Sequence, residues 1–158
     1  MIYMEKRIQL KTLNLVKFDE EYQAHKDFIN QLGTDQELVS NLELEELNAQ
    51  NFTKMDLMQP YYFIVEDQLQ NAKVGILIMD FFKQGTAVEL RYAVKKEFRG
   101  KGYATKILHE VGSYLFENLD HLAYIELYID ANNKYSIQAA KNAQFKPEGS
   151  SVYARFKH

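Results

Sequence analysis

Cysteine is absent from this 158-residue chain, which excludes disulfide bonds, thiolate catalysis and cysteine-ligated zinc sites. Proline and glycine are scarce, with two and seven residues, so the sequence offers little room for a flexible linker. No apolar run approaches the roughly 20 residues that span a bilayer, and the N-terminus lacks the apolar core of a signal peptide. We therefore predict a soluble, cytoplasmic protein with one domain over residues 1–158.

Neither sign of charge dominates the composition, and the net charge is only −3. Non-specific nucleic-acid binding normally needs a basic face, so a nucleic-acid partner is not expected. The four histidines show no metal-ligand spacing, and we expect no metal site and no membrane partner. A basic or amine-bearing substrate is compatible with this balance.

Apolar periodicity predicts an α/β fold. The expected helices cover residues 19–32 (capped by Asp19), 36–52, 104–118 and 135–143. The expected strands cover residues 6–16, 61–66, 73–82, 86–94 and 122–130, and a hairpin pairs residues 145–146 with 152–157. The order of these elements predicts a mixed sheet, antiparallel in its early part and parallel across the helix at residues 104–118.

A glycine-containing loop joins the strand at residues 86–94 to the following helix. Its sequence, Arg99-Gly-Lys-Gly-Tyr-Ala104, places flexible backbone at a helix N-terminus, where amide groups and the helix dipole can hold phosphate oxygens. The spacing does not fit a P-loop, and the loop's position in the chain does not fit a dinucleotide fingerprint. A ligand-free turn is the other interpretation of the loop alone.

Three segments in order make the chain resemble the GNAT superfamily of acetyl-CoA-dependent N-acetyltransferases. They are the loop, the strand Val88–Val94 before it, and the segment from Asn133-Lys-Tyr-Ser136 to Phe145. Within that family the chain is most similar to the ribosomal-protein N-terminal acetyltransferase subgroup. The resemblance implies a single-domain GNAT-like fold whose mostly antiparallel sheet has strands 86–94 and 122–130 parallel and splayed, flanked by about four helices. It also implies acetyl-CoA as co-substrate and is compatible with a homodimer.

The resemblance also implies which residues hold the cofactor. The pyrophosphate would lie on the loop and the first turn of its helix, at Arg99, Gly100, Lys101, Gly102, Tyr103, Ala104 and Thr105. The pantetheine arm would pair with exposed backbone of Ala93 and Val94, and Asn133 would contact the cofactor. A plain helix cap is the other interpretation of Asn133, and the two roles are compatible.

Acetyl transfer to an amine needs a base for the amine and a proton for the departing thiolate. Glu89, ten positions before Arg99, matches the family's glutamate base. Its partly buried cleft would raise its pKa, whereas a same-face ion pair with Arg91 would lower it. The family's usual proton-donating tyrosine is replaced by Ala140, so Ser136 is the candidate acid and Tyr135 the substitute. Gln144 stands where the family has a glycine, so the helix end is expected to differ locally.

The resemblance therefore implies an N-acetyltransferase whose acceptor is a primary amine, either a protein N-terminus or a small molecule. Direct attack of the amine on the thioester would be helped by Glu89 as general base. The alternative is a catalytically weak acyl-CoA-binding or interaction module, which the alanine at position 140 and the Glu89–Arg91 pair would favour.

Overall fold

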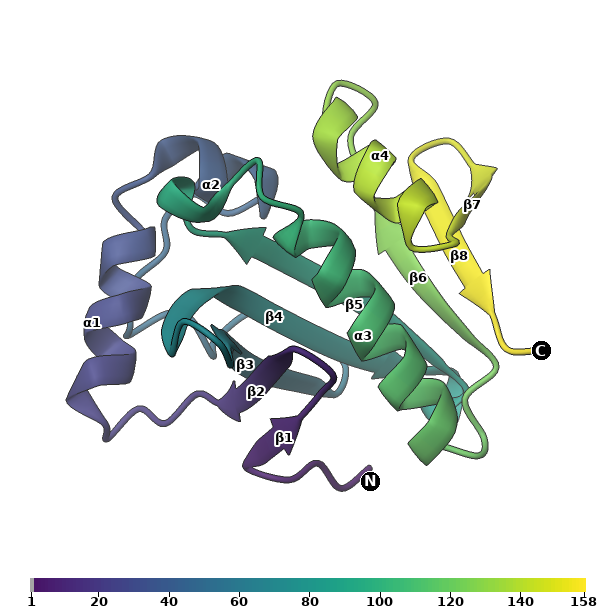
Figure 1. The fold of residues 1–158 in the computed structure, drawn as a ribbon, viewed down its shortest axis with the longest axis horizontal. Helices are drawn as coiled ribbons and strands as arrows, with labels where there is room; N and C mark the ends of the chain where they lie inside the picture. The colour runs from purple at the N-terminus through teal and green to yellow at the C-terminus, as the bar shows by residue number, and fades with distance from the viewer. Residues whose placement is uncertain (1) are drawn as a thin grey trace.

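The computed structural model describes residues 2–158, which form one eight-stranded sheet with helices on both faces (Figure 1). The α-helices are α1 (Gln23–Leu32), α2 (Gln36–Asn41), α3 (Tyr103–Asn118) and α4 (Lys134–Asn142). The strands are β1 (Arg7–Gln9), β2 (Leu13–Lys17), β3 (Pro60–Asp67), β4 (Ala72–Phe82), β5 (Ala87–Val94), β6 (Tyr124–Tyr128), β7 (Lys146–Gly149) and β8 (Val152–Phe156). Short 3-10 turns precede β5 and follow it. The predicted α/β class and the number of helices are confirmed.

The sheet is antiparallel except at one junction. Its strand order is β1-β2-β3-β4-β5-β6-β8-β7, and β5 and β6 are its parallel pair. They pair only from Ala87 opposite Tyr124 to Glu89 opposite Glu126. Beyond this point the two strands diverge (Figure 1), as the resemblance implied. The divergence leaves an opening in the middle of the sheet, lined by the rest of β5 and faced by α4.

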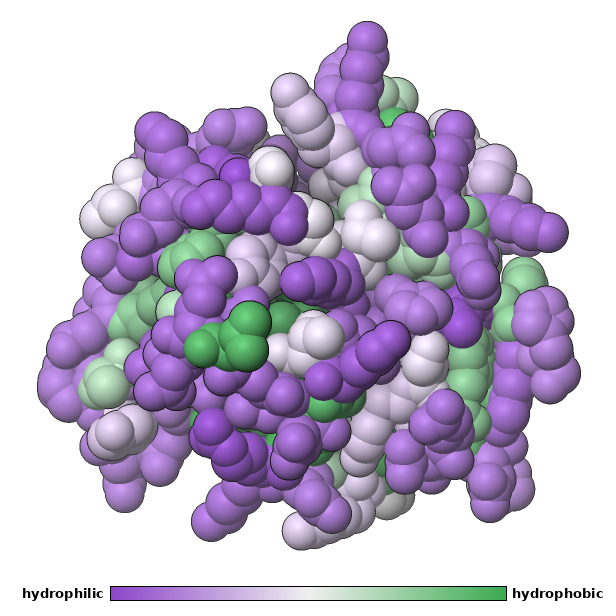
Figure 2. Space-filling view, in the orientation of Figure 1, coloured by the Kyte–Doolittle hydropathy of each residue, from purple (hydrophilic) through white to green (hydrophobic). Residues whose placement is uncertain are grey.

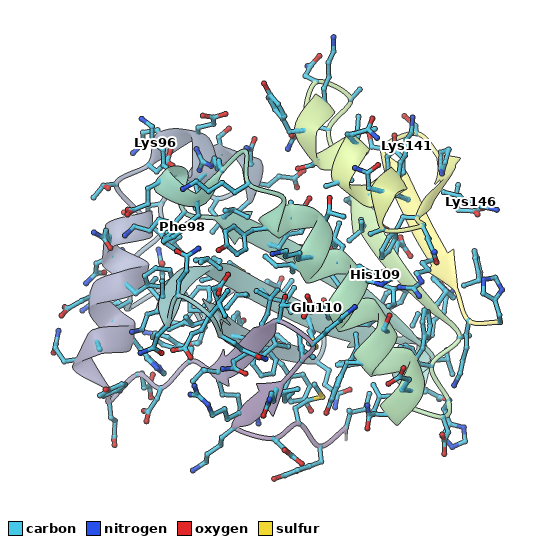
Figure 3. The ribbon with its side chains drawn as sticks, viewed as in Figure 1. Lys96, Phe98, His109, Glu110, Lys141 and Lys146 are labelled. Carbon is cyan, nitrogen blue, oxygen red and sulfur yellow. The ribbon has the colours of Figure 1, made fainter. Side chains whose placement is uncertain are left out.

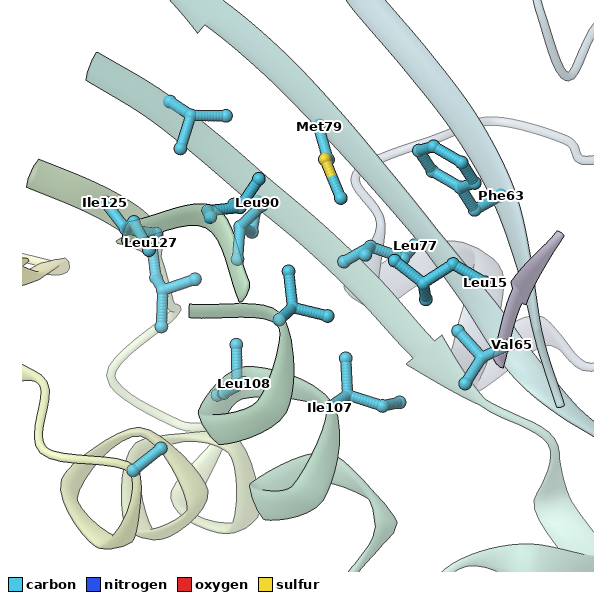
Figure 4. Close-up of a cluster of buried hydrophobic side chains, with 14 of the residues drawn as sticks. Leu15, Phe63, Val65, Leu77, Met79, Leu90, Ile107, Leu108, Ile125 and Leu127 are labelled. Atoms are coloured by element: carbon cyan, nitrogen blue, oxygen red, sulfur yellow. The ribbon is translucent and has the colours of Figure 1, made fainter. Parts of the chain in front are cut away.

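Two apolar cores lie on opposite faces of the sheet. The larger core joins the sheet to α3 and α4, and Leu90 of β5 points toward Ile107 and Leu108 of α3 (Figure 4). The smaller core packs α1 and α2 on the other face and includes Ala93 of β5. Successive side chains of a strand point to opposite faces. The β5 residues an even number of positions from Leu90 therefore face the larger core, and those an even number of positions from Ala93 face the smaller one.

The N-terminal part differs from the prediction in three elements. The expected first strand is two strands, β1 and β2, because the turn between them is held by Glu110 of α3, whose carboxylate accepts hydrogen bonds from the Thr12 and Leu13 amides. The first helix begins at Gln23, and the Asp19 carboxylate instead accepts a hydrogen bond from the Glu21 amide. The long second helix is wrong and is reduced to α2.

Side chains beyond α2 compete with the helix for backbone hydrogen bonds. Asn48 accepts hydrogen bonds from the amides of Gln50 and Asn51, and Asn51 accepts one from the Asn48 amide. Such local bonds favour turns over helix. The apolar side chains of this stretch still reach the smaller core, since Leu47 and Phe52 are buried there. The pattern of apolar residues therefore predicted their burial correctly but not their backbone conformation.

The end of α4 shows how the chain manages without glycine at position 144. Gln144 adopts a φ of 73°, and the next amide, of Phe145, donates to the Ala140 carbonyl at 2.9 Å. The helix thus ends in the left-handed turn that glycine would favour, so the expected local difference is wrong. The cost is backbone strain at Gln144, because a residue with a Cβ adopts this φ less readily than glycine.

Replacing Gln144 with glycine is expected to raise the free energy of unfolding by about 1 kcal/mol, because a non-glycine residue in the left-handed region costs about 1–2 kcal/mol and glycine loses part of that gain as chain entropy. Urea unfolding measures the change. The control Lys141→Gly, in the last turn of the same helix, should lower stability by about the same amount. Equal losses for both variants would contradict the strain at Gln144.

None of the helices found in residues 2–158 is long and apolar enough to cross a membrane.

Candidate active site

The opening between β5 and β6 leaves part of the β5 backbone without a neighbouring strand. The Lys95 amide donates to Val74 of β4, and the Thr86 carbonyl accepts from Ala123 just before β6. Since backbone groups alternate in direction along a strand, Tyr92 and Val94 face the opening, whereas the groups of Ala93 face β4.

This alternation corrects the assignment of Ala93, whose backbone pairs with Ile76 of β4 and is not free to bind a ligand. The Val94 carbonyl is also engaged, because it accepts a hydrogen bond from Arg99 Nε at 3.1 Å. The backbone groups left to face the opening are the Val94 amide and both groups of Tyr92.

The loop before α3 has the geometry of an anion cradle. Gly100 and Gly102 have φ values of 75° and 83°, and a Cβ added at either would meet no atom within 4 Å. Gly102 caps α3 without a side chain, so in the described chain the first-turn amides, including those of Ala104 and Thr105, have no intrahelical acceptor. Unpaired amides at the positive end of a helix bind phosphate oxygens, and the loop therefore fits a pyrophosphate.

The side chain of Tyr103 has a structural role. Tyr103 is only 4% exposed, and its hydroxyl donates to Asp67 at 2.6 Å while accepting from Gln70. Burial, followed by the bond to Asp67, raises the pKa of Tyr103 to about 12. Tyr103 thus fastens the start of α3 to the turn after β3, and only its backbone amide is available to a ligand.

Lys101 is the exposed cation of the loop. Its Nζ lies 5.8 Å from the centre of the Phe98 ring, and Figure 3 shows Phe98 and Lys96 at the turn between β5 and the loop. The ammonium is held near the cradle by a weak cation–π contact, and its charge is free to attract an anion.

Arg99 points away from the cradle and ties the loop to α2. Its Nη2 lies 2.7 Å from Asp35 Oδ2, and Nη1 lies 3.6 Å from Glu37. The other oxygen of Asp35 caps α2 by accepting from the Leu38 amide at 3.3 Å. Burial alone would raise the pKa of Asp35, but the Leu38 amide and Arg99 together outweigh burial and lower it. The guanidinium therefore positions the loop and does not lie among the cradle amides.

Replacing Asp35 with asparagine is expected to weaken acetyl-CoA binding by about three- to tenfold, the effect of losing one partly exposed ion pair. The asparagine still caps α2, so the change isolates the tie to Arg99. Calorimetric titration with acetyl-CoA measures it. The control Glu37→Gln removes a carboxylate that is 76% exposed and should leave the affinity within twofold. An unchanged affinity for Asp35→Asn would show that the tie does not position the loop.

Glu89 lies on the α1–α2 face of the sheet, at the last parallel pair before the opening. Its side chain is 14% exposed and accepts a hydrogen bond from Arg91 Nε at 3.0 Å, which confirms the expected same-face ion pair. Burial raises the pKa of Glu89 and Arg91 lowers it, as expected of each, and burial outweighs Arg91, so the pKa of Glu89 is raised. A carboxylate with these properties can act as a general base near neutral pH.

Two further carboxylates surround Glu89. Asp80 lies opposite it on β4 and Glu126 on β6, and their negative charges also contribute to raising the pKa of Glu89. Tyr128 approaches Glu126, and that hydrogen bond, with burial, raises the pKa of Tyr128 to about 12. With Arg91 as the adjacent cation, this face of the opening is negatively charged.

The start of α4 forms the other wall of the opening. Asn133 caps this helix, with Oδ1 accepting from the Ser136 amide at 3.2 Å, so the helix-cap interpretation is confirmed. The cap leaves the Asn133 Nδ2 group free for a ligand. Ser136 is half-buried, whereas Tyr135 is 93% exposed and its side chain lies in solvent. Ser136 therefore stays a candidate proton donor, and the exposure of Tyr135 argues against it.

Sequence reasoning missed several residues of the site. Asp80 interrupts an otherwise apolar run in β4, and this is a signal that could have found it. Asp35 and Glu126 had no such signal, because their roles depend on which strands and helices lie side by side. Among residues 2–158, no group of three or more potential ligands is arranged so that it could hold a metal ion.

The face of the molecule shown in Figure 2 is mostly hydrophilic.

The sequence profile of the acetyltransferase (GNAT) domain matches residues 12–146. Among curated protein sequences, none is significantly similar to the chain. A GNAT-family acetyltransferase from Bacillus anthracis has a similar structure, with a TM-score of 0.79, 17% identity, and coverage of 95% of this chain and 98% of the other.

Two further similar structures are those of acetyltransferases with named substrates. An acetyltransferase from Salmonella typhimurium that modifies the N-terminal serine of ribosomal protein L7/L12 has a TM-score of 0.73 and 18% identity, covering 93% and 96% of the two chains. Spermidine N-acetyltransferase from Vibrio cholerae, bound to CoA and spermine, has a TM-score of 0.70 and 18% identity, covering 90% and 92%. At these identities the likeness shows a shared fold.

Proposed function

Because the chain belongs to the GNAT acetyltransferase family, we propose that it transfers the acetyl group of acetyl-CoA to a primary amine with Glu89 as general base. The observation that carries this proposal is the position of Glu89, a half-buried carboxylate at the point where β5 and β6 stop pairing. The whole chain, residues 1–158, would form one catalytic domain acting in the cytoplasm, where acetyl-CoA is made and used.

Acetyl-CoA would bind on the α3 side of the opening. The amides from Gly100 to Thr105 would hold the pyrophosphate, with Lys101 adding charge. The pantetheine arm would follow the free backbone of Tyr92 and Val94, and Asn133 would donate to it from α4. These contacts would direct the thioester toward the end of the β5–β6 pairing.

The acceptor would approach from the α1–α2 face. An amine enters largely protonated at neutral pH, and the carboxylates of Asp80, Glu89 and Glu126 favour a cation there. Glu89 would take the amine proton, directly or through water, before the nitrogen attacks the carbonyl carbon. The proposed acceptor is thus a cationic amine. The structural neighbours named for a ribosomal protein N-terminus and for spermidine both act on amines. The only ground for proposing a homodimer is membership of the family. No nucleic-acid partner is proposed.

A thiol-release assay tests the function directly. The protein is incubated with acetyl-CoA and a panel of polyamines, aminoglycosides and short peptides with free N-termini, and binding of acetyl-CoA is measured by calorimetry alongside. We expect binding and turnover of at least one polycationic amine. Binding without turnover would favour the acyl-CoA-binding module, and the absence of both would reject the proposal.

A further inference from the structure

Tyr92 brings a phenol to the opening from β5 itself. Its side chain packs against the larger core, on the same face as Leu90, which points toward α3 (Figure 4). It lies three residues beyond Glu89, where β5 no longer pairs with β6. The ring therefore lies under the free edge of β5, on the face opposite the Glu89 carboxylate.

The hydroxyl of Tyr92 is buried without a hydrogen-bond partner in the described chain. Burial raises the pKa of Tyr92, and the side chain of Ser136 opposes this in part. The two hydroxyls thus approach each other across the opening, although no hydrogen bond of good geometry joins them. The phenol is protonated at neutral pH and has no acceptor for its proton.

The wall of α4 that Tyr92 approaches carries no phenol of its own. Ser136 and Ala140 are four residues apart and share one face of α4. Ala140 is fully buried in the larger core, so its methyl group leaves that face without an acid. A phenylalanine at position 92 would fill the same apolar surroundings without leaving a buried hydroxyl unpaired, so packing alone does not account for the hydroxyl.

We propose that Tyr92 protonates the departing CoA thiolate, as a catalytic residue of the reaction assigned above, on which this inference rests. When the new C–N bond has formed and the C–S bond breaks, the sulfur takes the proton of Tyr92 Oη. The phenolate regains a proton from solvent by way of the Ser136 hydroxyl. The ammonium loses two protons: Glu89 passes the first to solvent before the attack, and takes the second from the nitrogen once the C–N bond has formed and passes it to solvent as well. The products are the N-acetylated amine and CoA with a free thiol, and one proton is released per turnover.

Tyr92→Phe tests the proposal, because the variant keeps the ring and loses only the hydroxyl. We expect kcat to fall about 100-fold, at the lower end of the range for general acids, with the dissociation constant of acetyl-CoA within twofold of wild type. The melting temperature should equal or exceed that of the wild type, since an unpaired buried hydroxyl is removed. The control Tyr114→Phe removes another partly buried phenol, on α3 near Glu5, and should leave kcat unchanged.

The two proposals fail in different ways. If the wild type turns over an amine and Tyr92→Phe retains more than half of kcat, the role of Tyr92 is rejected while the acetyltransferase function stands. A variant that loses kcat together with a lower melting temperature would show a structural role and also overturn the inference. If the wild type turns over no amine in the panel, the proposed function itself has failed.

Discussion

Glu89→Gln is expected to lower kcat by at least about 100-fold, the lower limit for losing a general base, while KM for acetyl-CoA stays within twofold. The substitution keeps the shape of a side chain that is 14% exposed and still close to Arg91. The acetyl-CoA contacts are proposed on the loop and on the α3 side of the β5 edge, so binding of the thioester should not depend on this carboxylate. Steady-state kinetics with the preferred amine measure both constants.

The pH dependence of kcat/KM tests whether Glu89 is the general base. A base must be ionised to act, and the pKa of Glu89 is raised above its ordinary value of 4.5. Activity should therefore be lost as the pH falls through this raised pKa, and the acid limb of kcat/KM should lie above pH 4.5. Arg91→Gln removes the cation that opposes the shift, so it should move the acid limb to still higher pH.

Glu66→Gln is the matched control. Glu66 lies on β3, is 16% exposed on its side chain and pairs with Arg7 at 2.9 Å, far along the sheet from the opening. The Glu66→Gln variant loses an ion pair comparable to that of Glu89 with Arg91, and its kcat should equal that of the wild type. Turnover of Glu89→Gln within threefold of wild type would remove Glu89 from the mechanism.

Gly102→Ala is expected to weaken acetyl-CoA binding by at least about tenfold. Position 102 has a φ of 83°, and a residue with a side chain adopts this conformation at a cost of about 1–2 kcal/mol. The added methyl group would also occupy open space beside the first-turn amides, where the pyrophosphate is proposed to lie. The methyl group acts on the bound state, and the strain weakens binding as far as the unbound loop relaxes to relieve it; calorimetry with acetyl-CoA measures their sum.

Gly149→Ala provides the comparison for Gly102. Gly149 ends β7 and also has open space around its Cα, but its φ is not in the left-handed region. Its replacement should leave acetyl-CoA affinity within twofold. An unchanged affinity for Gly102→Ala would show that the loop does not hold the pyrophosphate, and a matching loss in Gly149→Ala would show that the effect is not local.

Periodicity and motif predicted the elements that build the acetyl-CoA side of the site. The apolar residues of α3 recur at helical spacing, and the alternation in β5 places Glu89 and Arg91 on one face, so both elements could be derived locally. The residues from Glu43 to Phe52 could not, because their leucines are buried by tertiary packing in a segment without regular structure. Local spacing carries no information about such a segment.

Side-chain direction was the other quantity that the sequence could not provide. Arg99 was expected in the phosphate loop, but its guanidinium turns toward an acid 64 residues earlier in the chain. The pKa of Glu89 also depended on the fold, because the sequence indicated both the ion pair that lowers it and the burial that raises it, but not which of the two is larger. Nothing in the sequence distinguishes Tyr92 from the other aromatic residues of the strands, and only its unpaired hydroxyl in the fold does so.

The Arg99–Asp35 ion pair has a consequence for how enzymes of this design can diverge. The groups proposed to act on acetyl-CoA come from one uninterrupted stretch, from Tyr92 to Ser136, whereas α1 and α2 on the proposed acceptor side come from residues 23–41. The two segments are joined by the ion pairs of Arg99 and by packing of Ala93 in the smaller core, and the short pair with Asp35 links them at the loop. Substitutions in the earlier segment can therefore alter acceptor preference while the donor half is inherited unchanged, provided that an acid is retained at position 35.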